Sequence, residues 1–153
     1  MRDLEIATEE LKNSSHSLIV AKNGRIILCK QEGGIKPLFD AVLELGDDMK
    51  HSSVADRVIG KAAAALCISG GIIGVYTPVM SRAAVRLLAE NGIVHSTDLM
   101  VPGIMNRDKT DLCPLEKLTS GTDSWEEVLE IVRDFAKKPF DRGLDSGRER
   151  RGE

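Results

Sequence analysis

The chain has 153 residues, 42% of them hydrophobic and 29% charged, and carries a formal net charge of −3. This length suits one globular domain with a sizeable core, and no stretch approaches the roughly 20 apolar residues of a membrane span. The slight negative charge and the single Trp and Tyr disfavour nucleic-acid binding, which needs cationic surface and stacking rings.

The first predicted elements are a helix, a hairpin and a second helix. Leu4, Ala7 and Leu11 recur at helical spacing and predict a short amphipathic helix. Residues 17–22 and 25–30 predict two strands, because Asn23-Gly24 between them is the dipeptide that type I′ hairpin turns favour. The next helix is expected to begin at Pro37, run through Leu45 and stop at Gly46.

The central part of the chain predicts a buried helix, a strand and another helix. Residues 53–67 are apolar on nearly every helical face and predict a buried helix that ends at Gly70-Gly71. Residues 72–76 predict a short strand. Thr77-Pro78 is typical of a helix start, and Asn91-Gly92 of its end.

The last part of the chain alternates strand, loop and helix. Residues 93–96 predict a strand, and residues 99–101 a possible further one, before a loop over 102–111. Pro114 opens a short helix through Leu118. Ser124, with Glu127 three residues later, predicts a capping box for a helix to about Lys137.

The predicted domain covers residues 1–138, and residues 139–153 form a charged, Gly-rich tail that we expect to be mobile. The order of elements predicts an α/β fold in which helices cover both faces of a sheet, with the hairpin at one end.

The strand, proline, helix and closing Gly-Ile of residues 72–93 resemble the second half of a cytidine-deaminase zinc site. In that family Pro-Cys-x-x-Cys opens one helix, and a His- or Cys-x-Glu opens the helix before it. In this alignment Pro78 matches the motif proline, while Val79 and Arg82 stand at the two cysteine positions.

In the same alignment, Val54 stands at the His or Cys position and Asp56 at the catalytic Glu position. Valine has no lone pair, and arginine is a permanent cation. We therefore expect no metal, no cofactor and no zinc-dependent deamination.

The chain as a whole also resembles a bacterial and archaeal family of unknown function. The matching segments are Ala-Asp-Arg-Val-Ile-Gly-Lys-Ala-Ala-Ala at 55–64, Asn-Arg-Asp at 106–108 and Cys-Pro-Leu-Glu at 113–116. The resemblance covers about residues 18–118. It implies a three-layer, cytidine-deaminase-like mixed sheet with an N-terminal hairpin, and the likeness to deaminases implies a homo-oligomer.

The residues near the start of the predicted helix 53–67 each allow a structural and a functional interpretation. Asp56 either completes a capping box with Ser53 or faces a ligand cleft as an acid. Gly60, one turn further, leaves room for a ligand to approach. Lys61 either extends its amine to water along an apolar surface or contacts a phosphate or carboxylate.

The remaining candidate residues have the same ambiguity. Arg82 is a surface cation or an anion contact in the first turn of its helix. Cys113 is either a packed thiol or a thiol activated at a helix N-terminus. Asn106 and Arg107, next to Asp108, either recognise a ligand or form a turn. Cys29, Cys67 and Cys113 are scattered, which favours a reducing cytoplasm.

The leading hypothesis is a zinc-free domain that binds a nucleotide-like or other anionic small molecule. One alternative is a metal-independent enzyme with Asp56 as acid/base and Cys113 as nucleophile. Another is an oligomerisation protein in which the cleft is vestigial, and a filled cleft would favour it.

Overall fold

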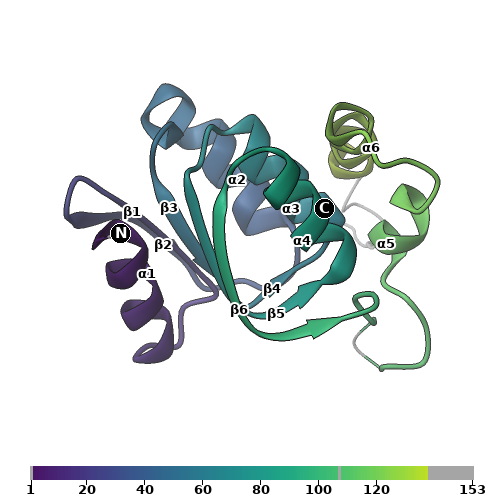
Figure 1. Ribbon diagram of the computed structural model, residues 1–153, viewed down its shortest axis with the longest axis horizontal. Coiled ribbons are helices and arrows are strands. Elements are labelled where there is room, and N and C mark those ends of the chain that lie inside the picture. The colour runs from purple at the N-terminus through teal and green to yellow at the C-terminus, as the bar shows by residue number, and fades with distance from the viewer. Residues whose placement is uncertain (1, 107, 138–153) are drawn as a thin grey trace, which may run out of the picture.

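The computed structural model describes residues 2–106 and 108–137, which build an α/β fold on one mixed, six-stranded sheet (Figure 1). Its strands are β1 (Leu18–Lys22), β2 (Arg25–Lys30), β3 (Ser53–Asp56), β4 (Val58–Ile59), β5 (Gly74–Ser81) and β6 (Val94–Val101). Its helices are α1 (Arg2–Lys12), α2 (Lys36–Leu45), α3 (Lys61–Ser69), α4 (Arg82–Glu90), α5 (Pro114–Thr119) and α6 (Trp125–Lys137), with a 3-10 turn η1 (Gly46–Met49).

The sheet combines an antiparallel and a parallel half. β1 pairs antiparallel with both β2 and β3, whereas β3, β4 and β6 all pair parallel with β5. β3 and β4 lie one after the other along one side of β5, and β6 lies along its other side. The predicted hairpin is confirmed, since Asn23 and Gly24 have φ of 55° and 84°.

Helices cover both faces of the sheet, as Figure 1 shows with α1 on one side and α2, α3 and α4 on the other. The main core lies on the second side, where α3 is buried between the sheet and α6. The first side holds a smaller apolar cluster, formed by Ala7, Leu11, Ile19, Ala21, Ala55 and Tyr76. The predicted α/β sheet with helices on both faces is thus confirmed at this coarse level.

Arg57, between β3 and β4, fastens α1 to the sheet. Its Nε donates to the carbonyl of His16 at 3.0 Å, and one terminal nitrogen donates to the carbonyls of Leu11 and Ser14, both at 2.9 Å. One side chain therefore satisfies carbonyls at the end of α1 and in its connection to β1.

The predicted helix over residues 53–67 is wrong in its first half. Residues 53–59 form β3 and β4, and α3 begins at Lys61 with Gly60 as its N-cap. A strand covered on both faces is as continuously apolar as a buried helix, so the pattern alone does not separate the two. Parallel pairing with β5 decides for the strand.

The predicted helix start at Thr77-Pro78 is also wrong, because Pro78 lies inside β5. It falls level with the break between β3 and β4, since Tyr76 pairs with Ala55 and Val79 with Val58. A residue without an N–H is tolerated at such an interruption of the ladder. α4 begins instead at Arg82, where Ser81 Oγ accepts the N–H of Ala84 at 3.1 Å.

The later elements agree better with the predictions. Residues 94–101 form one strand rather than two, and α5 starts at Pro114 as predicted. Ser124 Oγ accepts the N–H of Glu127 at 3.4 Å at the start of α6. The predicted tail, residues 139–153, lies outside the described residues. No helix in the described part of the chain is long and apolar enough to cross a membrane.

Candidate functional site

The candidate site lies at the N-terminus of α3, where the parallel strands β4, β5 and β6 end. Ligands of open α/β sheets bind at this edge. Gly60 links β4 to α3, and the chain after β6 passes over it on the way to α5. A Cβ on Gly60 would lie 2.8 Å from Glu116 Oε1 and 3.0 Å from Ile104 Cγ1. The glycine therefore makes room for the chain's own side chains, where the sequence predicted room for a ligand.

Glu116 of α5 closes the N-terminus of α3. Its Oε1 accepts the N–H of Lys61 at 3.4 Å, and its Oε2 accepts the N–H of Ile104 at 2.8 Å. A carboxylate at this position satisfies an N–H that has no partner inside the helix, and its charge interacts favourably with the helix dipole. Two main-chain donors from separate segments thus converge on one anion.

Lys61 is buried, with 7% of its surface exposed. Its Nζ donates to the carbonyls of Thr119 at 3.0 Å and Thr122 at 2.7 Å, and lies 3.4 Å from Asp123 Oδ1. These three acceptors match the three donors of an ammonium group. The prediction that the amine reaches water is therefore wrong, and the amine is engaged by the end of α5 rather than offered to a ligand.

Asp56 lies at the end of β3, half-buried, on the face of the sheet that carries the main core. It pairs with Leu18, whose side chain belongs to that core, and directly paired residues share a face. Burial raises the pKa of Asp56 to about 7, against smaller opposing effects of the N–H and the charge of Arg57. The predicted capping box is wrong, because Ser53 and Asp56 both lie on a strand.

The cysteine that interacts with Asp56 is Cys67 of α3. Burial, with a smaller contribution from the charge of Asp56, raises the pKa of the Cys67 thiol. Cys113 is the N-cap of α5, and its N–H donates to the carbonyl of Ile104 at 2.9 Å. No hydrogen bond or electrostatic interaction within residues 2–106 and 108–137 joins Cys113 to Asp56.

Of the other predicted residues, Arg82 and Asn106 make no hydrogen bond to Glu116 or Lys61 within the part of the chain that the structure describes. Arg82 is exposed at the first residue of α4. The Asn106 side chain is engaged within its own loop, where Oδ1 accepts the N–H of Thr110 at 3.1 Å and Nδ2 donates to Thr110 Oγ1 at 3.3 Å. This geometry corresponds to the turn interpretation. Arg107 lies outside the described residues.

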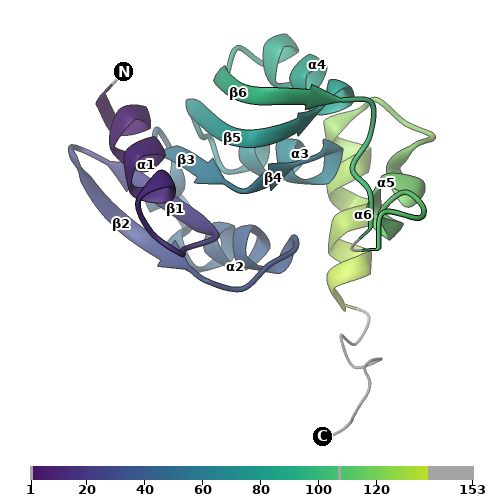
Figure 2. The same cartoon turned by 90° about the horizontal axis from the view of Figure 1, so that it is seen from below.

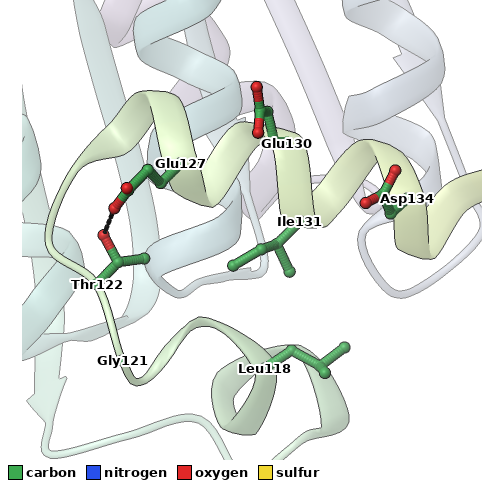
Figure 3. Close-up of a pocket in the computed structure, with 7 residues that line it drawn as sticks. All are labelled: Leu118, Gly121, Thr122, Glu127, Glu130, Ile131 and Asp134. Atoms are coloured by element: carbon green, nitrogen blue, oxygen red, sulfur yellow. Dashed lines mark hydrogen bonds between the residues drawn. The ribbon is translucent and has the colours of Figure 1, made fainter.

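A shallow hollow of the described surface lies elsewhere, between α5 and α6 (Figure 3). It is open to solvent, has a volume of about 350 Å³, and is lined by Leu118, Gly121, Thr122, Glu127, Glu130, Ile131 and Asp134. Figure 3 shows Thr122 hydrogen-bonded to Glu127 at one end. Because three of the lining side chains are carboxylates, this groove repels the anionic ligand that the sequence predicts.

Glu116 and Cys67 are the site residues that the sequence reasoning missed. Glu116 ends a segment that carries the family resemblance, but nothing local shows that it reaches a residue 55 positions away. Among the residues that the structure describes, no group of three His, Cys, Asp or Glu side chains is placed to hold a metal ion.

Comparison with known proteins identifies a family and a structure. Residues 6–136 match the family model described as "TM1506: Domain of unknown function (DUF1893)". The crystal structure of a DUF1893 family protein (TM1506) from Thermotoga maritima, at 2.70 Å resolution, is similar with 29% identity and a TM-score of 0.80. That similarity covers 87% of this chain and 89% of the other. No curated protein matches.

Proposed function

The chain belongs to the DUF1893 family, whose description assigns no activity, and from the geometry of its own residues we propose that it is an anion-binding domain. The binding position is the N-terminus of α3. In the described conformation, Glu116 occupies this position as an internal substitute for the ligand carboxylate or phosphate. The fold we propose is cytidine-deaminase-like and does not use zinc.

The succession β4, α3, β5, α4, β6 supports the proposed fold. In deaminases the starts of two such helices supply the zinc ligands. Here the helix starts are Gly60-Lys61 and Ser81-Arg82, which contain neither Cys nor His. The correction of both helix starts therefore leaves the zinc-free proposal in place.

The single observation that carries the binding proposal is the chemistry of the group at α3. The position is filled by a carboxylate beside the apolar side chain of Ile104, and two main-chain N–H groups hold the carboxylate. A vestigial cleft closed by packing alone would not require an anion there. A helix N-terminus that already binds one carboxylate is suited to bind another carboxylate or a phosphate.

Ligand binding then requires Glu116 to leave. A ligand anion would accept the N–H groups of Lys61 and Ile104, while α5 carries Glu116 away from Gly60. Arg82, exposed at the start of α4 on the same edge of the sheet, would supply positive charge to the bound molecule. A nucleotide-like ligand meets this arrangement through its phosphate.

Glu116→Gln tests the proposal, because it removes the competing charge and nearly keeps the side-chain size. We would titrate inorganic phosphate, uridine monophosphate and uncharged uridine, and follow the amide resonances of Lys61 and Ile104 by NMR. Both amides should shift with the two anions but not with uridine. The variant should bind about tenfold more tightly than the original chain, because a resident charge no longer competes.

Glu130→Gln, an exposed change on α6, is the matched control and should bind like the original chain. If neither amide resonance shifts in Glu116→Gln at millimolar phosphate, Glu116 only holds α5 against the start of α3, and the cleft is vestigial.

The pKa of Asp56, raised to about 7 by burial, would also suit an acid/base group near neutral pH. This observation supports the enzyme alternative, although Cys113 is not the partner of Asp56 in the described contacts. We place the domain in the cytoplasm, since its free cysteines fit a reducing compartment.

A further inference from the structure

β6 forms one edge of the sheet and exposes apolar side chains along it. Within the described residues it pairs only with β5, and Figure 2 shows it as the outermost strand on that side. Val94, Leu99 and Met100 are 53%, 56% and 49% exposed. A long edge strand with unpaired backbone groups and apolar side chains is a template for further strand pairing.

We propose that a second copy of this chain pairs with this edge, β6 antiparallel to β6 of the partner subunit, so that one sheet continues through the dimer. A two-fold axis perpendicular to the sheet relates the two strands. The proposal does not depend on anion binding at α3, because it concerns a different edge of the molecule.

The backbone of β6 is suited to this pairing. The N–H of Val94 donates to the carbonyl of Ile73 at 3.2 Å, toward β5. Backbone groups alternate along a strand, so those of His95, Thr97 and Leu99 point away from β5. A partner strand finds the backbone groups of three alternate residues there, of which the Leu99 carbonyl also accepts a hydrogen bond from Thr97 Oγ1 at 3.2 Å.

The side chains select one register. With the axis at Thr97, that residue lies opposite Thr97 of the partner subunit, Ser96 opposite Asp98 of the partner subunit, and Val94 opposite Met100 of the partner subunit. Pairs of two threonines, of a hydroxyl with a carboxylate and of two apolar side chains are all favourable across strands.

The two neighbouring registers are worse. An axis at Asp98 sets two aspartates directly opposite each other, which is repulsive. An axis at Ser96 sets apolar Val94 opposite Asp98 of the partner subunit. Of these three registers, the one around Thr97 gives the most favourable pairs, and it also sets His95 opposite Leu99 of the partner subunit.

The charges of α4 agree with the same two-fold axis. α4 lies beside β6 in Figure 2, with exposed Arg82 at its first residue and exposed Glu90 at its last. The axis makes the two α4 helices antiparallel, so the cationic end of each faces the anionic end of the other. This complementarity favours a second copy over an unrelated partner.

Cysteine cross-linking tests the register, in a Cys29→Ser background that removes the exposed native thiol. Thr97→Cys should form a disulfide-linked dimer on mild oxidation, because only a residue on the axis meets itself within bonding distance. Ser96→Cys, one residue away, is the matched control and should stay largely unlinked. Equal linking of both variants would overturn the register.

Light scattering tests the interface itself. The original chain should have the mass of a dimer. Leu99→Lys should weaken association about tenfold or more, since a lysine on an edge strand opposes strand pairing. Leu43→Lys, on α2 at a leucine that is 67% exposed, should leave the dimer intact. A monomeric original chain, or a dimer that survives Leu99→Lys unchanged, would overturn the proposal.

Discussion

Asp56 makes the stability of the fold depend on pH. The carboxyl has a pKa near 3.8 when unfolded, and burial raises it to about 7 in the folded chain. Between these values the folded state binds a proton that the unfolded state does not, so stability falls as pH rises. The stabilisation is complete below about pH 4 and is lost as pH passes through about 7. One pKa unit corresponds to about 1.4 kcal/mol, so the effect reaches a few kcal/mol.

We therefore predict that Asp56→Asn removes most of this dependence. The variant should be more stable than the original chain at pH 8 to 9 and no more stable at pH 5, because asparagine carries no charge to bury. Urea unfolding at several pH values measures the difference. Asp47→Asn, at an exposed position, should follow the original chain throughout, and an unchanged slope in Asp56→Asn would show that another group titrates.

Lys61 is the second residue whose loss should be costly. Lys61→Met keeps the buried stem but leaves the carbonyl of Thr122 without its donor, and leaves the carbonyl of Thr119 with only the N–H of Thr122 at 3.4 Å. Unsatisfied buried carbonyls cost about 1–3 kcal/mol, so we expect the thermal midpoint to fall by several degrees. Lys50→Met, at an exposed lysine, should change it little. Equal midpoints for both variants would mean that the ammonium group adds nothing to stability.

At the scale of elements, the contact between α5 and the start of α3 depends on Gly60, which has no side chain. Gly60→Ala places a methyl group 2.8 Å from Glu116 Oε1 and 3.0 Å from Ile104 Cγ1. The backbone of Gly60, at φ −104° and ψ −169°, suits alanine. The expected loss of about 1–3 kcal/mol therefore comes from overpacking and from the hydrogen bonds that Glu116 gives up when it moves, and not from backbone strain.

Thermal unfolding of Gly60→Ala and Gly121→Ala measures this loss, since no atom lies within 4 Å of the added group in the control. Combining Gly60→Ala with Glu116→Ala should recover part of the stability, because the clash with the carboxylate disappears. If the double variant loses the sum of the stabilities lost by Gly60→Ala and Glu116→Ala alone, the added methyl group does not clash with the carboxylate.

The elements that the sequence predicted well are those with local signals. Asn23-Gly24 sets its turn through the positive φ of both residues, and Gly46 ends α2 with φ 52°. Ser124 starts α6 by accepting a hydrogen bond from the N–H of Glu127, three residues later. Each signal acts within a few neighbours along the chain, so a single sequence contains it.

The elements that the sequence predicted badly are decided by distant partners. Residues 53–59 become strands because β5 lies beside them, and Pro78 stays in β5 because its neighbouring strands are interrupted there. Periodicity does not contain that information. The role of Lys61 was not predicted correctly for the same reason. Its amine and its main-chain N–H find their partners in residues 119–123 and in Glu116, which are distant in the sequence.

At the scale of the whole molecule, the fold should be independent of metal. Neither helix start at the parallel-strand edge carries a thiolate or imidazole ligand, so nothing there competes for zinc. Elemental analysis of protein purified without chelator should show well under one zinc per chain, and an excess of EDTA should leave the unfolding transition unchanged. Near-stoichiometric zinc, or a transition lowered by EDTA, would contradict the zinc-free proposal.

The two faces of the sheet differ in how much apolar surface their helices bury. Arg57 lies at the face that buries less. α1 covers the first face with a small apolar cluster, whereas three helices cover the second. The guanidinium of Arg57 then holds three carbonyls of α1 and its connection to β1. Local opening follows the least buried layer. α1 should therefore detach from the sheet as a separate cooperative unit, and the release of the Arg57 side chain should be the opening step. The amide hydrogens of α1 should then exchange with solvent before those of α3.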